Sequence, residues 1–419
     1  MFSVESLLRD HSEKTYRNGT HRAVAPESTW QAVRPLLADF GITRVANVTG
    51  LDHVGIPVYM SCRPNSRSLA VSQGKGLDAI SAKVSAVMES IESWHAEFTQ
   101  APVRLETYAE MKRHAAVADV EKLPLCKGSL FASQRPIPWI MGRDLLSDEP
   151  VWVPFELVHA NATIPAVPGS GCFLPSTNGL ASGNNLTEAI LHALYEVIER
   201  DAMTLWELAT PDHYSATRVD CDSIDTTHCR EILARYRAAN ITPMVWNTTS
   251  DVGLPSFSAI IFDDESDSLL RPMSAAFGSG CHSDRSIAMA RALTEAAQSR
   301  LTGIAGSRDD MTQGSYRTSQ SEEALDFYRE LASERNAPVA YDEVVSYGAA
   351  SFRDDLVKVL DCLRRISIQQ VIAVDLSRPG FPIAVARAIV PGLEGPIESA
   401  WYTPGLRLKE RLSWIPTSS

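Results

Sequence analysis

Apolar side chains recur at helical spacing in two long segments of the chain, residues 78–98 and 187–205. Side chains three or four positions apart share one face of an α-helix, so each stripe predicts a helix with one buried face. Residues 287–301 follow a glycine-rich stretch, as the first two segments do, and they are predicted to form a third long helix. The stripes comprise Ile80, Val84, Val87, Met88 and Ile91 in the first segment, and Ile190, Leu191, Leu194, Val197 and Ile198 in the second.

Shorter patterns fill the intervals between these helices. Residues 42–59 alternate in strand fashion, and residues 370–376 form an apolar run typical of a buried strand. Residues 101–165 are rich in proline and predict a β-hairpin region, whereas residues 303–321 predict a polar loop. No linker interrupts the chain, so we expect a single α/β unit with internal repeats. Further helices are predicted at residues 28–41, 232–236, 322–334 and 356–363, and further strands at residues 244–246 and 257–262.

One arrangement occurs three times: a glycine-rich turn, a stretch of helical pattern, and then two carboxylate or amide side chains three residues apart. Such a pair projects from one helical face. On a single helix it usually marks no more than a solvated surface, but a solvated surface needs no fixed distance from a glycine turn. The glycine stretches are residues 74–76, 178–184 and 278–280, and the pairs are Glu89 with Glu92, Glu196 with Glu199, and Glu295 with Gln298.

Carboxylates that converge on one cavity repel each other unless a cation lies between them, and carboxylate oxygens are common ligands of Mg²⁺. Magnesium in turn indicates a bound polyphosphate. On this hypothesis the backbone N–H groups of the glycine turns hold phosphate oxygens, Lys75 adds a positive charge, and Arg200 is a phosphate partner. The alternative is that the glycines only mark sharp turns. The sequence has no P-loop, dinucleotide-binding or protein-kinase signature.

Other residues suggest different chemistry less strongly. His192 and Glu196 have the spacing of two metal ligands, but hydrolytic zinc helices usually carry two histidines, so a zinc site is disfavoured. Cys172 and Cys281 lie in or beside glycine stretches. A nucleophilic role for these cysteines competes with the favoured interpretation that they are small buried thiols.

The composition is that of a globular protein, because 44% of the 419 residues are hydrophobic and 21% are charged. The formal net charge of −12 argues against a general binder of nucleic acid or of anionic membranes. The sequence contains neither a signal-peptide core nor an apolar run long enough for a membrane span. The seven cysteines are scattered without a C-x-x-C pair, which indicates reduced thiols and a cytoplasmic protein.

Long stretches of the sequence resemble the YcaO family of ATP-dependent enzymes that modify peptide backbones. The resemblance runs from about residue 42 to residue 396, which we expect to form a YcaO-type ATP-binding catalytic domain. Residues 1–41 would then be an N-terminal extension, and residues 397–419 a C-terminal tail. The matching text is SQGKGLDAISAKVSAVMESIESWHAE at 72–97, STNGLASGNNLTEAILHALYEVIERDA at 176–202, and RALTEAAQSRL at 291–301.

The resemblance implies that the protein uses ATP and Mg²⁺. In the family, paired glutamates hold magnesium ions against the phosphates of ATP. The corresponding residues here are Glu89, Glu92, Glu196 and Glu199. Further nucleotide-binding positions are implied at Lys75, Asn184, Glu188, Arg200 and Arg308.

The resemblance also implies a reaction class. A nucleophile adds to a backbone carbonyl, ATP phosphorylates the resulting oxyanion, and phosphate departs in place of water. A neighbouring Cys, Ser or Thr side chain gives an azoline, external sulfide gives a thioamide, and an amine gives an amidine. Azoline-forming members often end in a P-x-P-x-P tail, whereas this chain ends in RLSWIPTSS.

The N-terminal text YRNGTHR, followed by GITRVANVTGLDHVGIPV, looks like that of members that act with a TfuA-type partner and form thioamides. A thioamide-forming enzyme is therefore the favoured prediction. The alternatives are a cyclodehydratase that makes azolines or a macrocyclic amidine, and a non-enzymatic member that binds a peptide or a partner protein. The predicted partners are a precursor peptide and a TfuA-like protein. No dedicated leader-peptide domain is expected, and a homodimer is left open.

Overall fold

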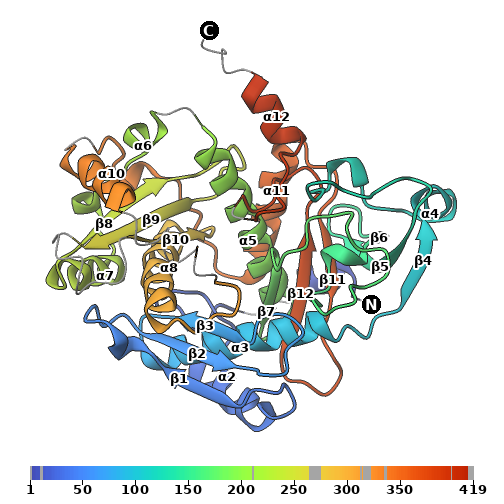
Figure 1. Cartoon of the computed structure of the whole chain (residues 1–419), viewed down its shortest axis with the longest axis horizontal. Coiled ribbons are helices and arrows are strands. Elements are labelled where there is room, and N and C mark those ends of the chain that lie inside the picture. The colour runs from blue at the N-terminus through green and yellow to red at the C-terminus, as the bar shows by residue number, and fades with distance from the viewer. Residues whose placement is uncertain are drawn as a thin grey trace.

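The computed structural model describes residues 2–9, 13–209, 212–263, 275–311, 314, 322–334, 337–397 and 399–413. Three long helices, α3 (Ala79–Glu97), α5 (Leu186–Glu207) and α8 (Arg285–Ala305), lie in the middle of the molecule (Figure 1). They are the three long helices that the sequence predicts, with ends that differ by a few residues. Each packs against a different antiparallel sheet.

The first sheet contains β1 (Arg44–Asn47), β2 (Val58–Cys62) and β3 (Val71–Lys75), and α3 lies against it. The second contains β8 (Ile241–Asn247), β9 (Ser256–Asp263) and β10 (Ala275–Cys281), and α8 lies against β9 and β10. In the third, α5 lies against β7 and β12. This third sheet runs in the order β4 (Val103–Thr107), β5 (Pro136–Asp144), β11 (Ile372–Asp375), β12 (Ala384–Ile389) and β7 (Leu180–Gly183), with β6 (Pro150–Pro154) paired to β5.

Shorter helices surround this arrangement, and four of them were not predicted, at residues 4–9, 108–114, 213–216 and 406–413. The second of these lies in the expected hairpin region and begins at a capping box made by Thr107 and Glu110. In the predicted polar loop at 303–321, residues 303–305 belong to α8, and residues 312, 313 and 315–321 lie outside the described residues. The last six residues of the tail also lie outside them. The shorter helices are α1 (Val4–Arg9), α2 (Pro26–Val33), α4 (Tyr108–His114), α6 (His213–Ala216), α7 (Thr227–Ala238), α10 (Glu322–Ser333), α11 (Phe352–Arg365) and α12 (Leu406–Ser413).

The threefold pattern in the sequence corresponds to three strand–helix units: β3 with α3, β7 with α5, and β10 with α8. Every unit has an Asp or Asn N-cap, at Asp78, Asn185 and Asp284, whose side chain accepts a hydrogen bond from a backbone N–H in the first turn. These caps satisfy N–H groups that the helix itself leaves unpaired. The predicted internal repeats are therefore present.

The glycines of the repeat lie mainly within strands rather than in the predicted turns. Gly74 is in β3, Gly183 ends β7, and Gly278 is in β10. A Cβ atom at Gly74 would lie 1.9 Å from the backbone nitrogen of Ala86, and one at Gly278 would lie 2.3 Å from the carbonyl oxygen of Ala292. Helix backbone therefore packs directly on strand backbone at these positions. The prediction of turns there is wrong, because the absence of a side chain serves close packing instead.

The three units contact one another in cyclic order. Helix α3 of the first unit contacts β7 of the second, α5 of the second contacts β10 of the third, and α8 of the third contacts β3 of the first. Each helix thus has one side on its own sheet and another on the strand of the next unit. The three helices that carry the pairs of polar residues are consequently arranged around one central region.

The N-terminal part of the chain is tied to this centre. Lys14 Nζ lies 2.6 Å from Asp355 Oδ2 of α11, and both side chains are buried. Arg22 Nη1 lies 3.2 Å from Glu188 Oε1 of α5, and α2 packs against α3. In the described part of the chain, no helix combines the length and apolarity needed to cross a membrane.

Candidate nucleotide and metal site

Two of the predicted metal-binding glutamates connect neighbouring units. Glu92 on α3 accepts hydrogen bonds through Oε1 from the hydroxyl of Ser182 on β7, at 2.5 Å, and from its backbone N–H, at 2.8 Å. Glu199 on α5 accepts a hydrogen bond from the hydroxyl of Ser279 on β10 at 2.7 Å, and one from the backbone N–H of Cys281 at 2.9 Å. The same kind of contact therefore occurs at two successive boundaries between units.

The third boundary is closed by an ion pair. Lys75 Nζ on β3 lies 2.6 Å from Glu295 Oε2 on α8, and both side chains are about one fifth exposed, at 19% and 20%. Burial alone would raise the pKa of Glu295, but Lys75 and Arg200 outweigh it and lower that pKa. Lys75 is thus at the predicted site, although it neutralises a carboxylate there and does not lie in a glycine turn.

We call the carboxylates of Glu89, Glu92, Glu196, Glu199 and Glu295, which come from the helices of the three units, the ring. Three of them are held in an environment that disfavours their charge. Burial raises the pKa of Glu89 to about 7, that of Glu92 to about 8, and that of Glu196 to about 7. The charges of Glu89 and Glu196 contribute to the rise at Glu92, and the charge of Glu199 contributes at Glu196. Electrostatic interactions therefore link the four predicted metal-binding glutamates in series, from Glu89 through Glu92 and Glu196 to Glu199.

Cationic side chains surround these carboxylates. Arg200 Nη2 lies 4.0 Å from Glu199 Oε1. The charge of Arg200 opposes the rise in the pKa of Glu196 but does not cancel it. Arg308 forms a hydrogen-bonded ion pair with Asp310. The charge of Arg308 opposes the rise in the pKa of Glu89 but does not cancel it. Both arginines therefore interact with predicted metal-binding glutamates and do not lie on a distant surface.

Two other predicted nucleotide-binding residues form a second polar group next to the ring. Glu188, which is 1% exposed, accepts hydrogen bonds from the side-chain amide of Asn184 at 3.1 and 3.3 Å. It also accepts one from the backbone N–H of Ala23 at 3.1 Å and pairs with Arg22. Thr29 donates to Asn184 at 2.8 Å. In this structure the N-terminal segment therefore satisfies much of the hydrogen bonding of Asn184 and Glu188.

Three arginines that the sequence reasoning missed also reach the site. Arg291 Nη2 on α8 lies 3.9 Å from Glu199 Oε2, and the charge of Arg291 also opposes the rise in the pKa of Glu196. Arg22 interacts electrostatically with Glu92 as well as with Glu188, and Arg387 on β12 interacts with Glu196. Arg291 lies four residues before Glu295, so helical spacing alone could have identified it. The other two come from distant segments, and no local pattern marks them.

The alternative nucleophiles and the zinc pattern fit less well. Cys172 and Cys281 are both fully buried. Burial raises the pKa of Cys172 to about 11 and that of Cys281 well above its usual range, so little reactive thiolate forms at neutral pH. Burial and the neighbouring Arg22 lower the pKa of His192 well below its usual range, and in the described residues His192 belongs to no cluster of ligand atoms.

Among the described residues, three potential metal ligands have ligand atoms within 4.8 Å of one another: His21, His282 and Asp355. The ammonium of Lys14 is paired with Asp355 at 2.6 Å, so a cation is already present beside this cluster. Burial lowers the pKa of His21 to about 4, which keeps its imidazole neutral. We therefore interpret the cluster as a buried polar anchor for the N-terminal segment.

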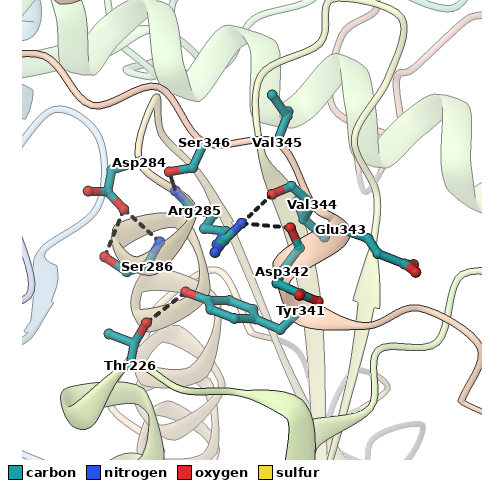
Figure 2. Close-up of a pocket in the computed structure, with 10 residues that line it drawn as sticks. All are labelled: Thr226, Asp284, Arg285, Ser286, Tyr341, Asp342, Glu343, Val344, Val345 and Ser346. Carbon is teal, nitrogen blue, oxygen red and sulfur yellow. Dashed lines mark hydrogen bonds between the residues drawn. The ribbon is translucent and has the colours of Figure 1, made fainter.

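A separate hollow of about 540 Å³ lies at the N-terminal end of α8 (Figure 2). Its main cation, Arg285, donates to the carbonyl oxygens of Asp342 and Val344, both at 2.9 Å, and lies over the ring of Tyr341. The guanidinium is thus used to hold the segment around residues 341–346. The predicted site residues do not line this hollow.

Comparison with known proteins gives consistent matches. A family model described as "YcaO cyclodehydratase, ATP- and Mg²⁺-binding" matches residues 73–394. An uncharacterized protein from the region 3′ of tfuA in Rhizobium leguminosarum bv. trifolii is 38% identical over 391 residues, which cover 92% of this chain and 91% of that protein. An uncharacterized protein from Methanothermobacter thermautotrophicus is 37% identical over 382 residues, with 89% and 95% coverage.

Two solved structures share the fold. YcaO from Methanopyrus kandleri, bound with AMPPCP and Mg²⁺, aligns with a TM-score of 0.72 at 22% identity and covers 94% of this chain and 98% of its own. A heterocyclase in complex with substrate and cofactor aligns with a TM-score of 0.77 at 20% identity over 98% of this chain. This chain spans only 58% of the length of that heterocyclase.

Proposed function

The chain belongs to the YcaO family, and on that premise we propose that it uses ATP and Mg²⁺ to modify backbone amides of a peptide. The observation that carries the proposal is the ring of carboxylates from three strand–helix units. Glu89, Glu92 and Glu196 all have a raised pKa, and cationic side chains surround them. A protein that held no cation there would gain nothing from several half-buried carboxylates that repel one another.

The donor set fits magnesium rather than a softer metal. All four predicted ligands are carboxylates, and Mg²⁺ prefers hard oxygen ligands, whereas zinc sites are usually built from Cys and His. Among the described residues, no three of these glutamates place their oxygens in one tight ligand cluster. This spacing suits a metal that shares its ligands between protein and phosphates. Bound Mg²⁺ would neutralise phosphate charge and stabilise the charge that develops during transfer.

Arg200, Arg291, Arg308 and Lys75 then provide the remaining positive charge around the phosphates. Arginine can engage phosphate oxygens through parallel hydrogen bonds, which fixes orientation as well as charge. Glu188, Asn184 and Arg22 would orient the nucleotide beside the metal-binding carboxylates. The protein's own task is thus to position the reactants and balance charge.

For the product, we propose a thioamide. Hydrosulfide adds to the carbonyl carbon of a backbone amide, and the carbonyl electron pair moves to oxygen. This oxyanion attacks the γ-phosphorus of ATP, and ADP leaves. The C–O bond then breaks, phosphate departs, and the S–H proton is lost, which leaves C=S in place of C=O. Support for this choice comes from the relative that lies in the region 3′ of tfuA, because it favours a member that acts with a TfuA-like partner.

The test combines the purified chain with Mg-ATP, sulfide, a TfuA-like protein and a synthetic peptide for each short open reading frame beside the gene. We expect a product that is heavier by the exchange of oxygen for sulfur, and ADP formation that depends on the peptide. A product lighter by one water, formed without sulfide, would instead indicate an azoline- or amidine-forming cyclodehydratase. Binding of peptide without any ATP turnover would indicate a non-enzymatic binding protein.

A further inference from the structure

The guanidinium of Arg387 is buried, and some of its N–H groups have no hydrogen-bond acceptor in the part of the chain that the structure describes. The residue is 2% exposed, and its Nη2 donates to the carbonyl oxygen of Ser176 at 2.6 Å. Its Nε and Nη1 have no hydrogen-bond partner among the described residues. Burying a charged donor without a partner costs free energy, so such a group indicates that something else accepts these hydrogen bonds.

The same guanidinium lines a small cavity of about 40 Å³. A single water molecule needs a cavity volume of only about 10–15 Å³, so this cavity has room for a small polar group. Most of its wall is apolar, and it includes Leu174, Val197 and Leu393. Asn178 also lines it, and the Oδ1 atom of Asn178 is buried without a partner in the described part of the chain.

The cavity therefore offers unpaired donors on one residue and an unpaired acceptor on another. The phosphates of Mg-bound ATP are ionised at neutral pH and offer acceptors only, so they would leave Asn178 Oδ1 unsatisfied. A secondary amide has one strong acceptor, its carbonyl oxygen, and one donor, its N–H. This complementarity, together with the apolar walls, matches a peptide backbone rather than a triphosphate.

The position of the cavity agrees with this assignment. Glu196 interacts electrostatically with Arg200 and Arg291, which belong to the proposed phosphate side, and also with Arg387. Among the carboxylates of the ring, Glu196 is the one with which Arg387 interacts. Arg387 thus links the wall of the cavity electrostatically to Glu196, one of the predicted metal-binding carboxylates.

We propose that Arg387 and Asn178 bind the backbone amide that is to be modified. Arg387 donates to its carbonyl oxygen, and Asn178 Oδ1 accepts from its N–H. The inference deepens the proposed function and rests on it for the chemistry, although not for the binding itself. Arg387 is then a catalytic residue, because it contacts the reacting oxygen.

This contact has a consequence for the reaction. When the nucleophile forms its bond to the carbonyl carbon, the C=O π electrons move to oxygen, and the adjacent guanidinium stabilises the negative charge. The oxyanion then forms a bond to the γ-phosphorus as the bond to ADP breaks. Loss of a donor that stabilises an oxyanion typically lowers kcat about 100- to 1,000-fold.

The binding test uses N-methylacetamide, the smallest analogue of a peptide amide. We expect it to shift the Nε–H resonance of Arg387 in ¹⁵N-arginine-labelled protein, with saturation at high concentration; the resonance is assigned by its loss in Arg387→Lys. Asn178→Ala should lower the affinity for N-methylacetamide, so that saturation needs a higher concentration. A shift caused by Mg-AMPPCP but not by N-methylacetamide would mean that Arg387 contacts phosphate. No shift with either ligand would mean that it only holds Ser176. Both outcomes would overturn the proposal.

The kinetic test separates catalysis from folding. Arg387→Lys should lower peptide-dependent kcat about 100-fold or more, leave KM for ATP nearly unchanged, and keep the melting temperature close to that of the parent. Added guanidinium should partly rescue Arg387→Ala. Arg143→Lys, on β5 of the same sheet and paired with Asp148 at 3.0 Å, serves as the control and should retain activity. A wild-type protein that binds N-methylacetamide but modifies no peptide would overturn the proposed function and leave the amide site standing.

Discussion

Single carboxylates differ in how much the fold depends on them, and Glu196 and Glu199 illustrate this. We predict that Glu196→Gln lowers ATP turnover about 100-fold or more, because it removes an anionic metal ligand. The folded state should tolerate this change, because a half-buried carboxylate with a pKa of about 7 gains little from its charge. Steady-state ATPase assays and thermal melts would measure both effects. Glu121→Gln, at an exposed position, is the control.

Glu199→Gln should lower ATP turnover by at least as much, about 100-fold or more, and it should also lower the melting temperature. Glu199 is 2% exposed and accepts hydrogen bonds from both Ser279 and Cys281, so an amide in its place would lose an acceptor. Normal activity with unchanged magnesium dependence in both variants would contradict the site.

A second prediction concerns Arg200, which a lysine cannot replace in spite of its equal charge. Arg200→Lys should lower kcat more than about 10-fold, since an ammonium cannot form the parallel hydrogen bonds of a guanidinium. The control is Arg364→Lys, because Arg364 pairs with Asp361 on an exposed face of α11 and such pairs contribute about 0–1 kcal/mol. Equal kinetics for the two lysine variants would mean that Arg200 only forms a weak surface ion pair and does not bind phosphate.

The third prediction follows from the raised pKa of Glu92. Below about pH 4.5 this carboxyl is protonated in both the folded and the unfolded state. As pH rises toward 8, the unfolded state ionises first, so the wild type without ligand loses stability over that range. Glu92→Gln cannot titrate. Its free energy of unfolding should therefore rise relative to wild type between pH 5 and 8 by up to about 4 kcal/mol, at about 1.4 kcal/mol per pKa unit.

Chemical denaturation at several pH values would measure this difference. Added Mg-ATP should stabilise the wild type more than Glu92→Gln at pH 8, because only the wild type offers the carboxylate to the ion. A pH-independent difference between the two proteins would contradict the assigned pKa.

At the residue scale, the sequence could identify groups that repeat along a helix but not those that meet across the fold. Glu89, Glu92, Glu196 and Glu199 share a spacing that a reader can detect. Arg387 gives no such signal, because its neighbours Ser176 and Glu196 come from segments about two hundred residues earlier. The predicted roles of the repeated residues remain predictions until a ligand is bound.

At the scale of elements, the fourth prediction concerns the contact between β10 and α8. Gly278→Ala should destabilise the protein by at least about 2 kcal/mol, since the new Cβ would lie 2.3 Å from Ala292 O and from Ala296 N, both backbone atoms. Gly348→Ala is the control, because nothing lies within 4 Å of a Cβ there. Equal melting temperatures for the two variants would mean that the helix can move away at no cost.

The same contact explains which elements the sequence predicted. The apolar stripes of α3 and α5 are long and periodic, and both helices were placed correctly. Strands β7 and β10 are made largely of Gly, Ser and Ala, and β3 also contains Ser and Gly; these small residues carry no alternating pattern and are usually depleted or neutral in strands. Their glycines were assigned to turns for that reason. Only the helices packed on them show why small residues are needed.

At the scale of the whole molecule, the fifth prediction concerns the attachment of α12. Arg407 Nε lies 3.0 Å from Asp201 Oδ1, next to Arg200 in the chain, and its guanidinium also pairs with Asp251. Arg407→Ala would leave a fully buried carboxyl without its cation and should cost about 2 kcal/mol, less than a wholly buried pair because Arg407 is 17% exposed. Lys409→Ala, exposed on the same helix, is the control for thermal melts.

Burial already raises the pKa of Asp201 to about 6, so loss of Arg407 should raise it further and make the destabilisation greater at pH 8 than at pH 5. Unchanged stability of Arg407→Ala at both pH values would mean that α12 is not held by this pair.

The cyclic order of the three units also fixes when the site can exist during synthesis. Its last link, Lys75 with Glu295, joins residues 220 positions apart, so the first unit must wait, incomplete, until α8 has left the ribosome. Long-range closures of this kind form late because their loop entropy must be overcome first. We therefore expect nascent chains that stop before α8 to bind no ATP. ATP can stabilise the complete fold by binding to it, but it cannot guide the folding of the first two units.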